Sequence, residues 1–252
     1  MHTRLMIRVF VLITVIVSGI GLFHYYYFPQ RSNSLLAGIS GLANNGHGLY
    51  HHKDLNFQTK DSIKSIIEIS DARIKEFWYQ KLSDPIIIYC SDSIDFLKYG
   101  APISTIPAVT HLTPLGAFVV INGSLGLNTD VISHELCHAE LLERVGFLNK
   151  EFEIPVWFDE GLALMLDYRF SDLDAMYIKA VNKGSEKINL DELIGIEQFY
   201  SGTHDQIHMA YLCSGLEVRE WYQSVGADGL LELIDQLNAG EDFNKSYHNL
   251  QK

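Results

Sequence analysis

The chain begins with a long apolar block. Arg4 and Arg8 precede a stretch, residues 9–30, that contains no Lys, Arg, Asp or Glu and starts VFVLITVIVSGIGLF. About 20 apolar residues in a helix cross the roughly 30 Å hydrocarbon core of a bilayer. The block ends in the aromatic-rich run 24–28, which suits the headgroup level, and in Pro29, which ends a helix. Residues 1–30 are therefore predicted to be a transmembrane anchor.

Two other interpretations of this block stay open. A cleaved signal peptide has the same basic start, but it usually ends at a small-x-small site, and the best candidates lie at 32–37. A buried core helix is the third, although core helices seldom open a chain with so long an uncharged run. Because the basic residues precede the span, the positive-inside rule predicts that the N-terminus of this single-pass membrane protein lies in the cytoplasm. Its remaining residues are expected outside the cytoplasm, in the periplasm if the source is bacterial.

The pattern behind the anchor predicts a linker and then a folded domain. Residues 31–56 are rich in Ser, Gly and Asn and predict a linker, so the domain is expected at 57–252. From 59 to 82, apolar residues recur at three- and four-residue steps, which predicts an amphipathic helix. Short β-branched runs at 85–90 and 116–122 predict buried strands. The stretch 102–114 between them holds three prolines and few charges and is expected to be a loop.

The pattern in the second half of the chain predicts helices only. VISHELCHAELLERVGF follows an N-cap cluster at 128–130, and Pro155 opens a second helix, VWFDEGLALMLDYRF. From 188 onward the pattern is helical to the end. The order of helix, strands and then helices predicts an α+β fold, with a small N-terminal sheet, a central helix and a helical C-terminal subdomain.

Composition narrows the class of protein. With 47% hydrophobic residues the chain can bury a core, so intrinsic disorder is excluded for most of it. A formal net charge of −12, from 19 basic and 31 acidic residues, argues against a nucleic-acid partner. Three cysteines exclude a disulfide-stapled scaffold. Cys90 and Cys213 can pair outside the cytoplasm, and Cys137 is expected to pack in the core.

The motif that carries chemistry is His134-Glu135-Leu136-Cys137-His138. On a helix the two histidines lie about 40° apart around the axis, so both imidazoles can reach one metal ion. Glu135 lies about 100° from His134, beside the metal, where it can take a proton from a water and pass it to a leaving amine. The chain's composition gives this H-E-x-x-H pattern roughly 0.03 times by chance.

A catalytic zinc needs a third protein ligand and an open position. The metzincin pattern would put Gly at 141 and His at 144, but this chain has Leu141 and Arg144. Glu160, on the second helix, is the predicted third ligand, and the loop 147–155 is expected to be long enough to turn that helix back antiparallel. Asp159 is the alternative ligand. Glu160 can also be an ordinary carboxylate stabilised by the helix dipole.

The pair HELCHAE and WFDEGLA resembles the gluzincin zinc peptidases, in the peptidase MA-like group that also includes aminopeptidase-N-type enzymes. The shared pattern is H-E-x-x-H, about twenty residues, then an aromatic residue and E-G-x-A. The resemblance implies a zincin-like fold and a zinc ion held by His134, His138 and Glu160, with Glu135 as the general base. It covers roughly residues 60–245, and the departures are Cys137 and an Asp at 159 in place of Asn or Ser.

Two further roles follow from the resemblance. Related enzymes use a Tyr or His to steady the oxyanion of the tetrahedral intermediate, and Tyr211 is the first candidate, with His208 and His204 in reserve. Tyr211 as a plain core tyrosine is equally compatible with its helix. Zincins also pair extended substrate with a strand that precedes the metal helix, which would be 116–121 here.

The sequence thus predicts a membrane-anchored zinc peptidase that acts on peptide or protein substrates. Its rival is a gluzincin-like domain that holds zinc but serves binding or assembly at the membrane without proteolysis. A structural protein without metal would require both helix motifs to be coincidences.

Overall fold

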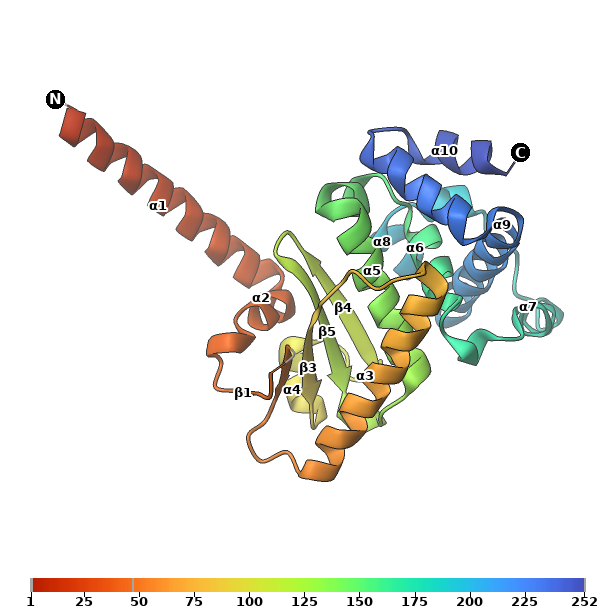
Figure 1. The fold of residues 1–252 in the computed structure, drawn as a ribbon, viewed down its shortest axis with the longest axis horizontal. Helices are drawn as coiled ribbons and strands as arrows, with labels where there is room; N and C mark the ends of the chain where they lie inside the picture. The colour runs from red at the N-terminus through yellow and green to blue at the C-terminus, as the bar shows by residue number, and fades with distance from the viewer. Residues whose placement is uncertain (1, 47, 252) are drawn as a thin grey trace.

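The computed structural model describes residues 2–46 and 48–251 (Figure 1). Its first helix, α1 (His2–Tyr27), projects from the rest of the molecule. The segment Arg8–Tyr27, with a mean hydropathy of 2.0, is long and apolar enough to cross a membrane. No other helix in the described part of the chain meets this condition. None of it is buried against the domain, so the core-helix interpretation is wrong.

The segment expected to be a linker carries ordered structure. It contains α2 (Pro29–Leu35), η1 (Ala37–Ile39) and two short strands, β1 (Ala43–Asn44) and β2 (Leu49–His51). β2 pairs in parallel with β3 (Ile86–Cys90), and β1 pairs antiparallel with β2. Strands of two and three residues are too short to show an alternating pattern, so the Ser- and Gly-rich turns around them dominate the sequence signal.

A five-stranded mixed sheet, in the order β1-β2-β3-β5-β4, forms one layer of the domain. The strands predicted at 85–90 and 116–122 are confirmed as β3 and β5 (Gly116–Asn122). The expected loop at 102–114 is wrong over part of its length, because β4 (Ala108–Thr113) lies within it and pairs antiparallel with β5. Its flanking prolines stand outside the strand, and an edge strand tolerates them there.

Helices cover both faces of the sheet. Ile87 and Tyr89 of β3 face the main core with α3 (Phe57–Trp78) and α5 (Thr129–Phe152), while Ile88 and Cys90 face α4 (Ser93–Tyr99) and α2. Side chains alternate between the two faces of a strand, so β3 and β5 are buried on both sides. The amphipathic helix predicted from 59 is confirmed as α3, which buries Ile63 and Ile74 completely.

The C-terminal part is helical, and the α+β class is confirmed. It consists of α6 (Val156–Leu164), η3 (Tyr168–Phe170), α7 (Leu173–Asn182), η4 (Leu190–Glu192), α8 (Ile196–Tyr200), α9 (His204–Asn238) and α10 (Phe243–Leu250). Together with η2 (Gly123–Leu125) these complete the described elements. The three cysteines are buried and free. Cys90 and Cys213 belong to different hydrophobic clusters, so the possible disulfide between them is not formed.

Close contact between α6 and α9 fixes the position of α6. A Cβ at Gly161 would lie 2.5 Å from the Ser214 carbonyl oxygen and 2.6 Å from Val218. Gly161→Ala is therefore expected to lower the free energy of unfolding by about 1–3 kcal/mol, as overpacking does, in urea denaturation. Gly38→Ala is the control, because its Cβ would meet only the Tyr50 hydroxyl at 3.5 Å. Equal stability of the two variants would contradict this close packing.

Candidate metal centre

The H-E-x-x-H segment lies on α5, whose start is fixed by a cap. The side chain of Asn128 accepts hydrogen bonds from the backbone N–H groups of Asp130 and Val131, which would otherwise lack helical partners. α5 then passes between the sheet and the helical layer, so it is buried on nearly all sides from 131 to 142. His134, Glu135 and His138 are each less than 10% exposed.

α6 brings Glu160 alongside α5. The expected loop at 147–155 is mostly wrong, because α5 continues to Phe152 after a kink at Gly146 and only residues 153–155 separate the two helices. Gly146 has φ 75°, a conformation that favours glycine, and it lets the chain change direction inside the helix. Pro155 caps α6, as predicted, and Glu160 follows in its second turn.

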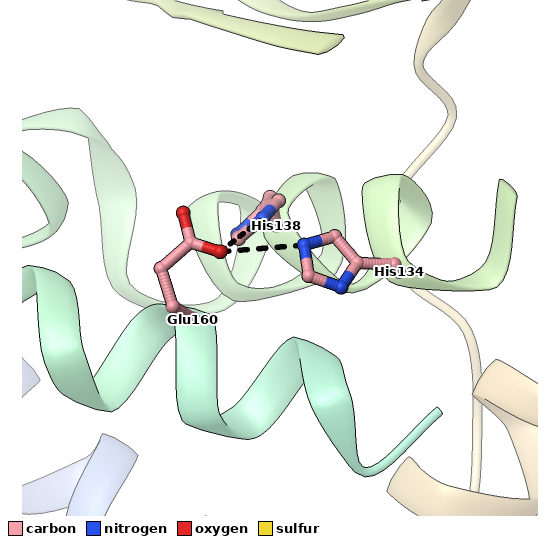
Figure 2. Close-up of side chains that lie close together, drawn as sticks. All are labelled: His134, His138 and Glu160. Atoms are coloured by element: carbon pink, nitrogen blue, oxygen red, sulfur yellow. Dashed lines mark ion pairs between the residues drawn. The ribbon is translucent and has the colours of Figure 1, made fainter. Parts of the chain in front are cut away.

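The structure brings together the three side chains predicted as ligands, His134, His138 and Glu160, which are called the metal group below (Figure 2). Glu160 Oε2 lies 3.3 Å from His134 Nε2 and 3.7 Å from His138 Nε2. One ligand atom from each residue lies within 4.8 Å of the other two. All three are buried, and Figure 2 shows the carboxylate of Glu160 turned toward both imidazoles.

These residues fit a zinc ion. Nitrogen and oxygen ligands about 2.0–2.1 Å from a tetrahedral zinc lie about 3.3 Å from each other, close to the observed separations. Glu160 Oε2 is buried and has no hydrogen-bond partner, which is costly unless a cation binds there. The other oxygen, Oε1, accepts a hydrogen bond of 2.6 Å from the Tyr200 hydroxyl. Two imidazoles and one carboxylate are also the donor set of a catalytic zinc site with one open position.

Asp159 contacts the metal group from behind and is not a member of it. Its Oδ1 lies 2.8 Å from His138 Nδ1, the ring nitrogen opposite the one that faces Glu160, and its Oδ2 lies 2.7 Å from the buried Lys150 ammonium. A carboxylate in this position fixes the tautomer and orientation of a ligand histidine. The alternative of Asp159 as the third ligand is therefore not supported by the geometry.

His134 has a similar acidic neighbour. Asp167 Oδ2 lies 3.7 Å from His134 Nδ1, and the Asp167 side chain is almost completely buried. Arg169 donates to both carboxylate oxygens of Asp167, which compensates the buried charge. Each of the two histidines predicted as ligands thus has a charge-balanced carboxylate on its outer side.

Removing Asp159 is expected to weaken zinc binding about 10- to 100-fold, the usual cost of losing the partner of a ligand histidine. Asp159→Ala leaves His138 without its acceptor and Lys150 without its counter-charge, whereas Asp159→Asn keeps the Oδ1 acceptor and should lie between the parent and Asp159→Ala. Competition with a chromophoric chelator measures the dissociation constants. Asp228→Ala, at an exposed carboxylate, is the control. Parent-like affinity of Asp159→Ala would contradict the orienting role.

The charges around His138 determine its protonation in the metal-free protein. Burial alone lowers the pKa of His138, but the carboxylates of Asp159 and Glu160 outweigh burial and raise the pKa to about 9. Burial alone would raise the pKa of Asp159, yet His138 and Lys150 hold it below its usual range. Metal-free His138 is therefore an imidazolium paired with Asp159 at neutral pH.

Zinc binding must displace this proton, because a ligand imidazole is neutral. Zinc affinity is expected to rise about tenfold per pH unit as the pH approaches about 9. Calorimetry in two buffers of different ionisation enthalpy should show about one proton released at neutral pH. The stability of the metal-free protein changes with pH in the opposite direction. Because folding raises the pKa of His138 from 6.5 to about 9, protonated His138 stabilises the folded state fully below pH about 6.5, and this stabilisation is lost as the pH rises toward about 9. Zinc affinity independent of pH would contradict this assignment.

Glu135 is held by the edge strand of the sheet. The Thr110 hydroxyl on β4 lies 2.7 Å from Glu135 Oε2 and 3.0 Å from the Glu135 carbonyl oxygen. The substrate-pairing strand predicted at 116–121 is wrong in position, because β5 has β3 on one side and β4 on the other. β4 lies at the edge of the sheet, next to the metal group, and has the unpaired backbone groups that such pairing requires.

Tyr211 lies beside the metal group, and the two reserve histidines line the same pocket. The Tyr211 ring centroid is 6.5 Å from that of His134, and its hydroxyl is 3.0 Å from the Tyr200 hydroxyl. Burial and the charge of Glu160 raise the pKa of Tyr211 well above its usual value, so it is a neutral hydrogen-bond donor. His208 is partly buried 6.5 Å from Phe170, and His204 is exposed.

Four residues of the site were not predicted from the sequence: Thr110, Lys150, Asp167 and Tyr200. Thr110 was not predicted because residues 102–114 were expected to form a loop. Tyr200 ends α8, a helix of five residues, and Lys150 and Asp167 act through contacts that cross between elements. The sequence of the chain does not indicate such contacts. The one available signal is that an acidic residue within an apolar helix is expected to be buried and therefore to need a partner.

The metal group opens into a cleft of about 910 Å³. It is lined by β4 and by the segments around Ile154, Ile194 and Tyr200. Arg31 of α2 and Glu151 of α5 line it as well, and His204 lies on its rim. A cleft of this volume accepts several residues of an extended peptide.

No protein-family model matches the chain, and no curated protein matches it in sequence.

Proposed function

We propose that this chain is a zinc-dependent peptidase of the gluzincin type, anchored in a membrane by α1, with its catalytic domain on the extracytoplasmic side. The observation that carries the proposal is the buried Oε2 of Glu160, which accepts no hydrogen bond and faces the Nε2 atoms of His134 and His138 on a neighbouring helix. The zincin-like fold is part of the proposal. An edge strand next to a buried metal helix, followed by a second helix that bears the glutamate, supports it.

His134, His138 and Glu160 would hold the zinc ion, which would polarise a peptide carbonyl and make a water molecule more acidic. Glu135 accepts the proton of the attacking water and delivers it to the leaving amine. The hydrogen bond from Thr110 to Oε2 fixes this carboxylate and leaves Oε1 for the proton. The neutral Tyr211 hydroxyl donates a hydrogen bond toward the oxyanion, after it leaves its contact with Tyr200.

A peptide library tests this function. Full-length protein in detergent, loaded with zinc, is incubated with a mixture of unstructured peptides, and new termini are identified by mass spectrometry. Cleavage that disappears with a chelator and returns with zinc supports the proposal. If zinc binds and no peptide is cut, the protein belongs to the rival class, a zinc-holding binding or assembly domain at the membrane.

A further inference from the structure

The contacts of α2 fix the anchor relative to the catalytic domain. The His24 ring Nδ1 and Ser32 Oγ lie 2.7 Å apart, which joins the last turn of α1 to α2. Asn33 Nδ2 donates to the carbonyl of Lys98 at 2.9 Å, and Ser34 Oγ donates to the carbonyl of Tyr99 at 2.8 Å. The connection from span to domain is therefore packed structure and not a flexible tether.

The same contacts lead directly to the metal centre. The carbonyl of Tyr99 is also 2.9 Å from His111 Nε2, so α2 and β4 meet at this one oxygen. Thr110, the residue before His111 on β4, donates a hydrogen bond to Glu135. The path from Tyr27 along α2 and across β4 to Glu135 is on the order of 25 Å, at about 1.5 Å per helical and about 3.3 Å per strand residue plus three side-chain contacts.

The side of the domain from which α1 leaves is apolar at its surface. In Figure 1, α2, the turn between β4 and β5 and the last turns of α5 all lie toward α1, while α7 lies at the opposite end. These segments and η1 carry large apolar side chains between 46% and 83% exposed, namely Leu36, Ile39, Leu115, Leu148 and Phe152. These five side chains, called the apolar rim, belong to segments on the side from which the membrane-spanning helix leaves, and apolar side chains at that level are stabilised in the bilayer interface.

The cleft reaches this rim. Its lining includes the metal group, Arg31 of α2 and Glu151, which lies between Leu148 and Phe152 in sequence. Arg31 stands four residues after the end of the segment Arg8–Tyr27. Part of the cleft lining thus lies where a polypeptide emerging from the same bilayer would first meet the protein.

We propose that the substrate class of this site is a polypeptide tethered to the membrane and cut close to the bilayer surface, with the apolar rim resting on the lipid. This inference rests on the proposed function and on α1 as an uncleaved anchor. A path of about 25 Å corresponds to about seven or eight extended residues at about 3.3 Å each. Cleavage is expected within about ten residues of the tethered end.

The position of the cleft can be measured without any activity. Single cysteines at Leu115 on the apolar rim and at Ile178 on α7, both exposed, are labelled with a fluorophore in full-length protein in vesicles. The three native cysteines are buried and free, so labelling is specific. Lipids with a spin-labelled headgroup should quench the Leu115→Cys probe at least about twofold more than the Ile178→Cys probe. Equal quenching, or a mature protein that lacks α1, overturns the inference.

The reach of the site is measured with tethered substrates. A random peptide library is attached to lipid through Gly/Ser spacers of increasing length and is also supplied free in solution. Parent protein should cut the shortest-spaced tethered peptides fastest and near the lipid. A variant with about 20 flexible Gly/Ser residues inserted between Phe28 and Pro29, which adds about 25 Å, should shift the preferred spacer to greater length.

The outcomes separate the two proposals. Cleavage of free and tethered peptides at the same rate, with no dependence on the spacer, overturns the membrane-proximal substrate and leaves the peptidase intact. An insertion variant with the same spacer preference as the parent also overturns it. No cleavage of any peptide by zinc-loaded parent protein overturns the proposed function and the substrate class together, while the quenching result still decides where the cleft lies.

Discussion

Glu135→Gln is expected to retain zinc and to lower the rate of peptide hydrolysis by about 10²- to 10⁴-fold, the usual contribution of a general base. Glutamine has the same shape and can still accept the hydrogen bond from Thr110, but it cannot take the proton of the attacking water. The loss should therefore fall on kcat, with little change in KM or in the zinc content.

The matched control is Glu143→Gln. Glu143 lies on the same helix two turns farther on and is exposed, so the substitution makes the same chemical change away from the cleft. Its turnover should equal that of the parent. Undiminished hydrolysis by Glu135→Gln would remove Glu135 from the general-base role, and loss of zinc from this variant would mean that Glu135 is a ligand.

Glu160→Gln is expected to have the largest effect on metal binding, with zinc affinity reduced by more than about 100-fold, beyond the cost of losing a residue that only orients a ligand. An amide is a weaker and uncharged donor, and two neutral imidazoles cannot compensate a divalent cation at a buried position. Tyr200 can still donate to the amide oxygen, so the packing around α6 should survive.

Zinc affinity of the parent, Glu160→Gln and Glu186→Gln is compared by competition with a chelator. Glu186 is exposed and lies outside the cleft. Circular dichroism checks that Glu160→Gln remains folded. Zinc binding by Glu160→Gln at parental affinity would contradict the three-ligand site, and Asp159 or Asp167 would then be the candidates for the third ligand.

The metal group could be predicted from the sequence because its residues are set by local geometry. His134 and His138 are one helical turn apart, and any helix of this register places both imidazoles on one face. Glu160 was predictable through the resemblance of the two motifs. The strands at 86–90 and 116–122 were predictable as well, since both are buried on both faces and read as continuous apolar runs.

The supporting residues could not be predicted because tertiary contacts define them. β4 reads as Ala-Val-Thr-His-Leu-Thr between two prolines, and only its pairing with β5 makes it a strand. Asp159 is adjacent to Glu160 in sequence, but the angular step of about 100° per residue directs it to the far side of His138. The ordered structure at 31–56 depends on pairing with β3 and on contacts with α4, which no local pattern records.

The most direct test of the central claim is the zinc content of the purified full-length protein, measured by elemental analysis after expression in zinc-replete medium and dialysis. The site described above predicts about one zinc per chain, lost from Glu160→Gln and retained by Glu135→Gln. Absence of zinc from the parent protein, with no uptake on adding the metal, would contradict the metal centre and the peptidase proposal built on it.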